Sequence, residues 1–254
     1  MRESILNGIK ACMFPLLSSS SPASSLDNSP AGSRVGSYDH APLKTATSVT
    51  SMTSSGTGGG ADVVSVIGMG GSGKTVIASA VVRDTGETAV AVYFSRIVFL
   101  AFGQTPVLRD VAMLAYSQLT GRSLGQSNDI AFDELLSVLA DAAFGVDVLL
   151  VMDDVWEPAH AEALNFVDRG TDSRVLVTTR LKGVFPGARE FELGVLSLED
   201  GAALLLECAG EARPGPPPLP KLLSDAVDLC GRLPLLLSIA GSMLEQHGTS
   251  KNHV

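Results

Sequence analysis

The pattern of apolar and polar positions divides the chain into short buried strands and amphipathic helices. Apolar runs predict strands at residues 63–67, 89–94, 147–152 and 174–178, with a short fifth strand at 191–193. Helical spacing of apolar residues predicts helices that open at Val76, cover residues 106–119 and 130–144, and run from a capping box at Ser197 to Ala209. Strands that alternate with helices predict an α/β domain whose sheet is mostly parallel and covered on both faces.

The segments on either side of this domain differ from it in composition. Residues 17–60 are rich in Ser, Thr, Gly, Ala and Pro, so we expect residues 1–60 to be a disordered leader that buries too little surface to fold. The first sixteen residues mix apolar side chains with Arg2 and Lys10. This pattern is compatible with a short amphipathic helix, a transit peptide or a frayed terminus. After a nucleotide-binding domain over residues 61–212, residues 213–220 predict a Pro-rich linker. Apolar segments within residues 221–254 predict a partial helical subdomain.

Composition and charge narrow the class of protein. The 254 residues are 45% hydrophobic, enough for a sizeable core, and the net charge of −9 argues against nucleic acid as a partner. The three cysteines are widely spaced and odd in number, which fits a reducing compartment better than a disulfide framework. No apolar run is long enough to cross a bilayer, so we expect a cytoplasmic protein with no membrane partner.

The clearest chemical signal is the segment from Gly68 to Thr75, which reads GMGGSGKT and matches the pattern G-x-x-x-x-G-K-[ST]. It stands between a predicted strand and a predicted helix, as a phosphate-binding loop must. Glycines let the backbone N–H groups converge on one anion at the positive end of the helix dipole. Lys74 is then expected to reach the β- and γ-phosphates of a nucleotide, and the Thr75 hydroxyl to ligate Mg²⁺.

Two further segments deliver polar residues to the ends of predicted strands. The sequence LLVMDDVW ends in Asp153 and Asp154, and SRVLVTTR ends in Arg180. Because ligands of open parallel sheets bind beyond the carboxyl ends of the strands, a carboxylate here would hold Mg²⁺ and a second would orient the attacking water. Arg180 would form a fork onto a γ-phosphate. Trp156, the only tryptophan, is interpreted as a core anchor, since large aromatic side chains mostly serve burial.

Together with CGRLPLLL at residues 230–237, these motifs resemble the NB-ARC family of signal-transducing P-loop NTPases. That family includes plant disease-resistance nucleotide-binding proteins and an animal apoptosis adaptor. The resemblance implies a five-stranded sheet in the order 5-1-4-3-2, flanked by helices and followed by the start of a small helical ARC-like subdomain. It also implies a winged-helix segment with a Met-His-Asp motif for which this chain offers no candidate, so the sequence is expected to be a fragment or a minimal member.

The resemblance implies roles for individual residues of this chain. Asp153 would serve Mg²⁺ with Thr75, Asp154 would assist hydrolysis with Lys74, and Arg180 would sense the γ-phosphate. The family usually has glycine before the Leu-Pro-Leu sequence, where this chain has Arg232. The expected nucleotide-binding residues are Gly68, Gly70, Gly71, Ser72, Gly73, Lys74, Thr75, Val76 and Pro234.

The function implied is an ATP/ADP-binding switch with slow Mg²⁺-dependent hydrolysis, coupled to defence- or cell-death-like signalling. Protein partners or self-association through segments outside this chain would follow from such a role. Two alternatives stay open. The first is a catalytic P-loop ATPase or kinase, which would turn over many times. The second is a scaffold that binds nucleotide without hydrolysing it.

Overall fold

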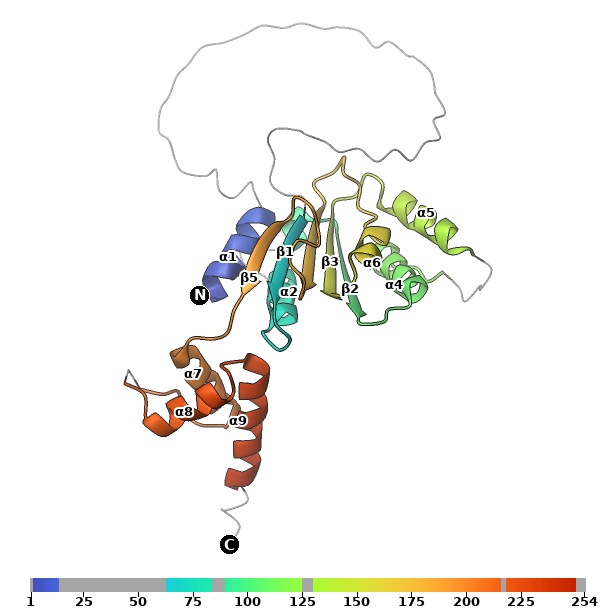
Figure 1. Ribbon diagram of the computed structural model, residues 1–254. Helices are drawn as coiled ribbons and strands as arrows, with labels where there is room; N and C mark the ends of the chain where they lie inside the picture. Colours follow the sequence, from blue (N-terminus) through green and yellow to red (C-terminus); the bar gives the residue numbers. More distant parts are fainter. Residues whose placement is uncertain (1, 14–62, 84–89, 125–129, 216–217, 250–254) are drawn as a thin grey trace, which may run out of the picture.

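The computed structural model describes residues 2–13, 63–83, 90–124, 130–215 and 218–249 (Figure 1). Its centre is one sheet of five parallel strands in the order β2-β3-β4-β1-β5. The strands are β1 (Val63–Gly68), β2 (Arg96–Gly103), β3 (Val148–Val155), β4 (Arg174–Thr179) and β5 (Arg189–Leu193). This is the predicted order 5-1-4-3-2 from the opposite edge, so the α/β P-loop fold and its sheet order are confirmed.

The second strand lies later in the chain than predicted. Residues 90–93 of the predicted strand 89–94 form a short helix, α3 (Val90–Tyr93), and residue 89 lies outside the described residues. Apolar periodicity alone does not separate a short buried helix from a strand, and the longer apolar run of β2 follows at once. The amide of Gln118 covers the outer edge of β2, because it accepts from the Phe99 N–H (2.7 Å) and donates to the Phe99 carbonyl (3.0 Å).

Helices cover both faces of the sheet and produce two separate cores (Figure 1). One face packs against α4 (Leu108–Thr120), α5 (Phe132–Ala143) and α6 (Pro158–Ala163). The other packs against α1 (Arg2–Met13) and α2 (Lys74–Val82). Successive residues of β3 alternate between the cores, with Leu150 in the first and Leu149 and Val151 in the second. This alternation explains why β3 reads as a continuous apolar run.

The helix α1 belongs to the folded domain. Ile9 is fully buried, and Cys12 and Met13 join the same core as β1 and β5. At Gly8 a Cβ would lie 2.7 Å from the Cε1 atom of Phe191, so the helix packs closely on β5. The expected disordered leader is therefore corrected for residues 2–13, where the amphipathic-helix alternative holds, while residues 14–62 lie outside the described part.

Three helices beyond β5 form a second unit: α7 (Leu198–Cys208), α8 (Lys221–Leu229) and α9 (Pro234–Thr249). The predicted cap is present, since Ser197 Oγ accepts from the Asp200 N–H at 3.0 Å. The helices share a small core (Leu196, Ala202, Leu205, Val227 and Leu237), so α7 packs with α8 and α9 although the sequence placed the domain boundary after it. At Gly241 a Cβ would lie 2.5 Å from the Cβ of Cys208, which shows how closely α9 approaches α7.

This helical unit lies beyond the end of the sheet where β1 leads into α2 (Figure 1). A backbone hydrogen bond from the Leu235 N–H to the Gly71 carbonyl (3.3 Å) joins α9 to the loop after β1. Among the described residues, no helix has both the length and the apolar character needed to cross a membrane.

Candidate functional site

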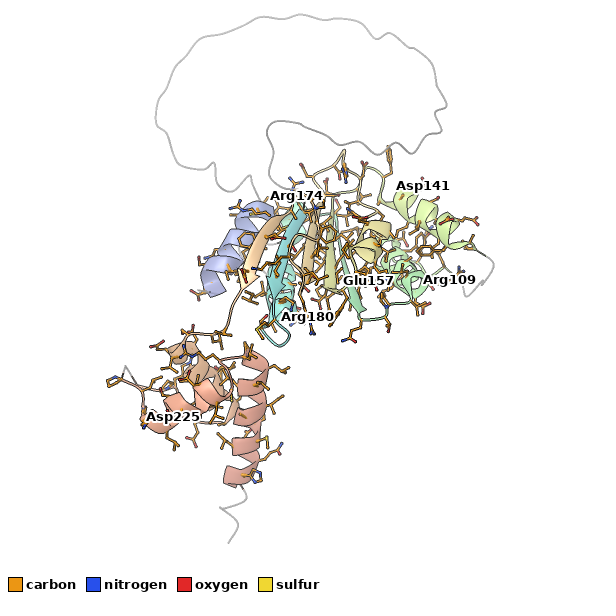
Figure 2. The ribbon with its side chains drawn as sticks, viewed as in Figure 1. Arg109, Asp141, Glu157, Arg174, Arg180 and Asp225 are labelled. Atoms are coloured by element: carbon orange, nitrogen blue, oxygen red, sulfur yellow. The ribbon has the colours of Figure 1, made fainter. Side chains whose placement is uncertain are left out.

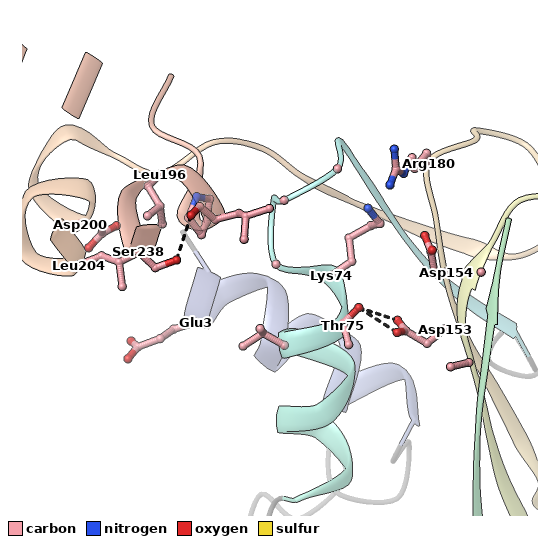
Figure 3. Close-up of a pocket in the computed structure, with 18 residues that line it drawn as sticks. Glu3, Lys74, Thr75, Asp153, Asp154, Arg180, Leu196, Asp200, Leu204 and Ser238 are labelled. Atoms are coloured by element: carbon pink, nitrogen blue, oxygen red, sulfur yellow. Dashed lines mark hydrogen bonds between the residues drawn. The ribbon is translucent and has the colours of Figure 1, made fainter. Parts of the chain in front are cut away.

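The segments that follow β1, β3 and β4 meet at the carboxyl edge of the sheet, as expected for parallel strands. Figure 2 shows the two ends of β4: Arg174 lies at the far edge, whereas Arg180 lies at the edge that faces the helical unit. In the close-up, Lys74, Asp154 and Arg180 gather on one side of a cavity (Figure 3). The sequence thus placed its three predicted catalytic side chains at one site.

The loop between β1 and α2 has the backbone of an anion cradle. Gly71 (φ +76°) and Gly73 (φ +94°) adopt left-handed conformations that favour glycine. The helix α2 begins at Lys74 without an acidic residue in its first turn, so its N–H groups and positive dipole end remain available to an anion. Gly68 has another reason to be glycine, because a Cβ there would lie 2.6 Å from the Leu193 carbonyl oxygen of β5.

Lys74 is held beneath this loop. Its Nζ donates to the carbonyl oxygens of Gly68 (2.9 Å) and Met69 (3.0 Å), and the residue is buried. Burial lowers the pKa of the Lys74 ammonium, and the positive charge of Arg180 lowers it further, against the opposing effect of Asp154 and Asp153. A bound polyanion such as a phosphate chain would compensate the positive charge of this desolvated ammonium.

Thr75 and Asp153 form the oxygen-rich corner of the site. The Thr75 hydroxyl lies 2.8 Å and 3.0 Å from the two carboxylate oxygens of Asp153, and the Thr178 hydroxyl donates to Asp153 Oδ1 at 2.6 Å. No group of three metal-ligating side chains occurs in the described part of the chain. Mg²⁺ commonly takes one or two protein oxygens and completes its shell with water and phosphate, so this hydroxyl–carboxylate pair fits it.

The backbone at Asp154 departs from regular strand geometry. Its φ is +54°, and the pairing of β3 with β4 shifts register between Met152 and Val155. Thr178 stabilises this bulge, because its Oγ1 accepts from the Asp154 N–H at 2.9 Å. Bulges re-aim side chains, and left-handed non-glycine residues cluster at functional sites. Figure 3 shows the result, with the Asp154 carboxylate directed toward Lys74 and Arg180.

Arg180 is exposed, and its guanidinium lies close to Gly70 on one side and to the Trp156 ring on another. A Cβ at Gly70 would be 3.1 Å from Arg180 Nη1, so the glycine leaves room for the arginine. On another side, the Arg180 Cζ lies 4.3 Å from the centroid of the Trp156 ring. Trp156 is only partly buried and lies outside the main cores, so its interpretation as a core anchor needs correction.

The helical unit supplies the opposite wall of the cavity, which has a volume of about 1070 Å³. Pro234, which the resemblance makes a nucleotide contact, lines it, and Leu235 packs on the loop, where a Cβ at Gly71 would lie 3.0 Å from Leu235 Cβ. Arg232, which replaces the expected glycine, has φ +55° and donates from Nε to Asp228 Oδ1 at 2.7 Å. The backbone at this position therefore has the left-handed conformation that favours glycine, although the residue is an arginine.

Most predicted site residues line this cavity: Gly70, Gly71, Gly73, Lys74, Thr75, Val76, Asp153, Asp154, Arg180 and Pro234. Gly68 and Ser72 do not, although the Gly68 carbonyl contacts Lys74. Sequence reasoning gave no role to Thr178 or to the lining residues Glu3, Leu196, Asp200, Leu204 and Ser238. The sequence predicts that the Thr-Thr-Arg segment places Thr178 at this edge, whereas the other five residues reach the cavity through the packing of α1 and the helical unit.

Comparison with known proteins agrees with this geometry. The family profile described as "NB-ARC domain" matches residues 48–213, well over half of the chain. The chain belongs to the NB-ARC family. NB-ARC domains are nucleotide-binding P-loop domains, and in this chain the loop with the phosphate-binding pattern lines the cavity at the sheet edge.

The similar curated proteins are plant disease resistance proteins. Probable disease resistance protein At4g33300 of Arabidopsis thaliana is 30% identical over 72% of this chain and 21% of its own length. Disease resistance protein RPM1 of Arabidopsis thaliana is 27% identical over 72% of this chain and 21% of its own. Disease resistance protein RGA2 of Solanum bulbocastanum is 28% identical over 72% of this chain and 19% of its own length. The chain thus spans about a fifth of the length of these relatives.

Proposed function

We propose that this NB-ARC domain is an ATP/ADP switch that hydrolyses ATP slowly with Mg²⁺ and couples the γ-phosphate to movement of its helical unit. The observation that supports this most directly is the shared cavity. One wall carries Lys74, Asp154 and Arg180, and the other carries Pro234 and Leu235. A ligand that fills it contacts both units, so its binding energy can depend on their arrangement.

Each residue has one role in this proposal. The cradle from Gly70 to Gly73 and Lys74 bind the phosphates, and Thr75 with Asp153 would hold Mg²⁺, which neutralises phosphate charge. Asp154 orients and deprotonates the attacking water, and Arg180 contacts the γ-phosphate. Pro234 packs against the base and sugar. Signalling in defence or cell death is the matching biological role, and the relatives named as disease resistance proteins support the defence part of it.

The test combines binding with turnover. Calorimetry should show Mg²⁺-dependent binding of ATP and ADP, and turnover should be slow, so that much of the protein retains bound nucleotide. Asp154→Asn should keep ATP affinity and slow hydrolysis about 100-fold, the lower range for loss of a general base. Asp141→Asn, an exposed carboxylate on α5, is the matched control and should change neither property.

The alternatives give different results. Rapid multiple turnover would indicate a catalytic ATPase or kinase. Tight binding with no hydrolysis, unaffected by Asp154→Asn, would indicate a scaffold with structural nucleotide. Absence of binding to either nucleotide would refute the proposal altogether.

A further inference from the structure

The indole of Trp156 has a feature that burial does not explain. Its Nε1 is inaccessible to solvent and finds no hydrogen-bond partner among the residues that the structure describes, whereas buried tryptophan N–H groups usually have one. The residue directly follows β3, after the register shift between Met152 and Val155, and does not belong to either core of the sheet. The face of the ring is in contact with the guanidinium of Arg180, whose Cζ lies 4.3 Å from the ring centroid.

This contact holds Arg180 in an unusual way. Within the part of the chain that the structure describes, Arg180 makes no ion pair with a carboxylate. A carboxylate would occupy the guanidinium N–H donors and neutralise its charge. An aromatic face attracts the cation through the ring quadrupole and leaves those donors unused. The indole thus fixes the arginine while the donors and charge remain available.

The second contact gives the guanidinium a defined place relative to the phosphate cradle. Atoms of the Arg180 guanidinium lie 3.1–3.3 Å from the point where a Gly70 Cβ would be. The arginine is therefore packed between the loop that receives phosphate and the Trp156 ring. The positive charge of Arg180 also acts on Lys74, which places both cations near the same ligand.

We propose that Trp156 is a positioning residue that sets the preference for ATP over ADP by holding Arg180 ready for the third phosphate. This inference rests on the proposed function, in which Arg180 contacts the γ-phosphate. ADP lacks that phosphate and gains nothing from an ordered Arg180. ATP gains the arginine contact without the entropic cost of ordering a long, exposed side chain.

The experiment measures affinities for ADP and a non-hydrolysable ATP analogue, with Mg²⁺, for the wild type, Trp156→Met and Trp156→Phe. Methionine fills space without a π face, and phenylalanine keeps a weaker one. We expect Trp156→Met to weaken binding of the ATP analogue about two- to fivefold, the value of an exposed cation–π contact, and to leave ADP affinity unchanged. Trp156→Phe should fall between Trp156→Met and the wild type.

Repeating the substitution in an Arg180→Ala background separates positioning from general packing. If Trp156 acts through Arg180, Trp156→Met should not change the ATP-to-ADP affinity ratio further once the arginine is gone. Equal losses for both nucleotides, or the same change in ratio in both backgrounds, would overturn the inference. Unchanged ADP affinity also shows that the variants fold.

Failure of the proposed function gives a different pattern. If Arg180→Ala leaves the affinity ratio unchanged, the γ-phosphate role of Arg180 fails, and this inference with it. If Arg180→Ala lowers the ratio but Trp156→Met does not, the switch stands and only the positioning role is refuted. Because Trp156 is the only tryptophan, Arg180→Ala should also change the emission of the nucleotide-free protein, and an unchanged spectrum would contradict the stacked contact.

Discussion

The buried hydroxyl of Thr178 joins the carboxylate of Asp153, which is the proposed Mg²⁺ ligand, to the bulge of β3. It donates to Asp153 Oδ1 at 2.6 Å and accepts from the Asp154 N–H at 2.9 Å, and Thr178 is fully buried. Thr178→Val keeps the shape of the side chain and removes both hydrogen bonds. Loss of a hydrogen bond to a charged group costs about 1.5–3 kcal/mol, so we expect the free energy of unfolding to fall by about 2 kcal/mol.

Thr178→Val should also weaken Mg²⁺-dependent nucleotide binding, in addition to lowering the stability of the fold. Without Thr178, the Asp153 carboxylate retains the Thr75 hydroxyl but loses its partner on β4. Groups that orient a metal ligand are typically worth about 10- to 100-fold in metal affinity. We therefore expect Thr178→Val to reduce the Mg²⁺-dependent part of ATP affinity about tenfold, measured by calorimetry with Mg²⁺ and with a chelator.

Thr179 provides the matched control one residue along the same strand. It is equally buried, but its hydroxyl donates to the Val155 carbonyl (2.7 Å) and accepts from the Leu181 N–H (3.1 Å), both backbone groups. Two neutral hydrogen bonds are worth roughly 1–3 kcal/mol together, so Thr179→Val should destabilise the fold to a similar degree. It should leave the Mg²⁺ dependence intact. If Thr178→Val keeps the full Mg²⁺ effect, or if both variants lose it equally, the role of Thr178 in orienting Asp153 for the metal is refuted.

Three further substitutions test other parts of the structure. Lys74→Ala should weaken ATP binding about 100-fold or more, because a charge-assisted contact to phosphate is lost, whereas the exposed Lys182→Ala should bind normally by calorimetry. Gly241→Ala should cost about 1–3 kcal/mol in urea unfolding, since the new Cβ would meet α7 at 2.5 Å. Gly194→Ala should be near neutral, because among the described residues no atom beyond its chain neighbours lies within 4 Å of the added Cβ. Arg232→Gly should be about 1 kcal/mol more stable than Arg232→Ala, because both lose the ion pair and only glycine relieves the positive φ.

The parts of the fold that could be predicted are those with a strong local signal. Glycine spacing, a flanking strand and a flanking helix located the phosphate-binding loop, and the strand ends placed Asp153, Asp154 and Arg180 at one edge. The second strand was misplaced because α3 and β2 are both short and apolar, and only pairing with β3 at Arg96–Gly103 separates them. Apolar periodicity does not contain that pairing information.

Features that depend on contacts between distant segments could not be predicted. The first helix gains its stability from Ile9 in the sheet core and from close approach to Phe191, neither of which its own composition reveals. The left-handed backbone at Asp154 results from the register shift against β4. The contact between Trp156 and Arg180 likewise joins the ends of two neighbouring strands, so the tryptophan alone suggested only burial.

The geometry also explains how the loop after β1 can influence the helical unit. Leu235 approaches this loop in two ways: its N–H donates to the Gly71 carbonyl, and its Cβ lies 3.0 Å from the point where a Gly71 Cβ would be. Gly71 already has a left-handed φ of +76° and a neighbour at 3.0 Å from its Cβ position, so the backbone has little room to shift without displacing Leu235. Leu235 lies in the first turn of α9, and α9 packs on α7 through Gly241. A phosphate that reorders the cradle would therefore act on the helical unit through Leu235, which is how, under the proposed function, a difference of one phosphate becomes a difference in the arrangement of the two units.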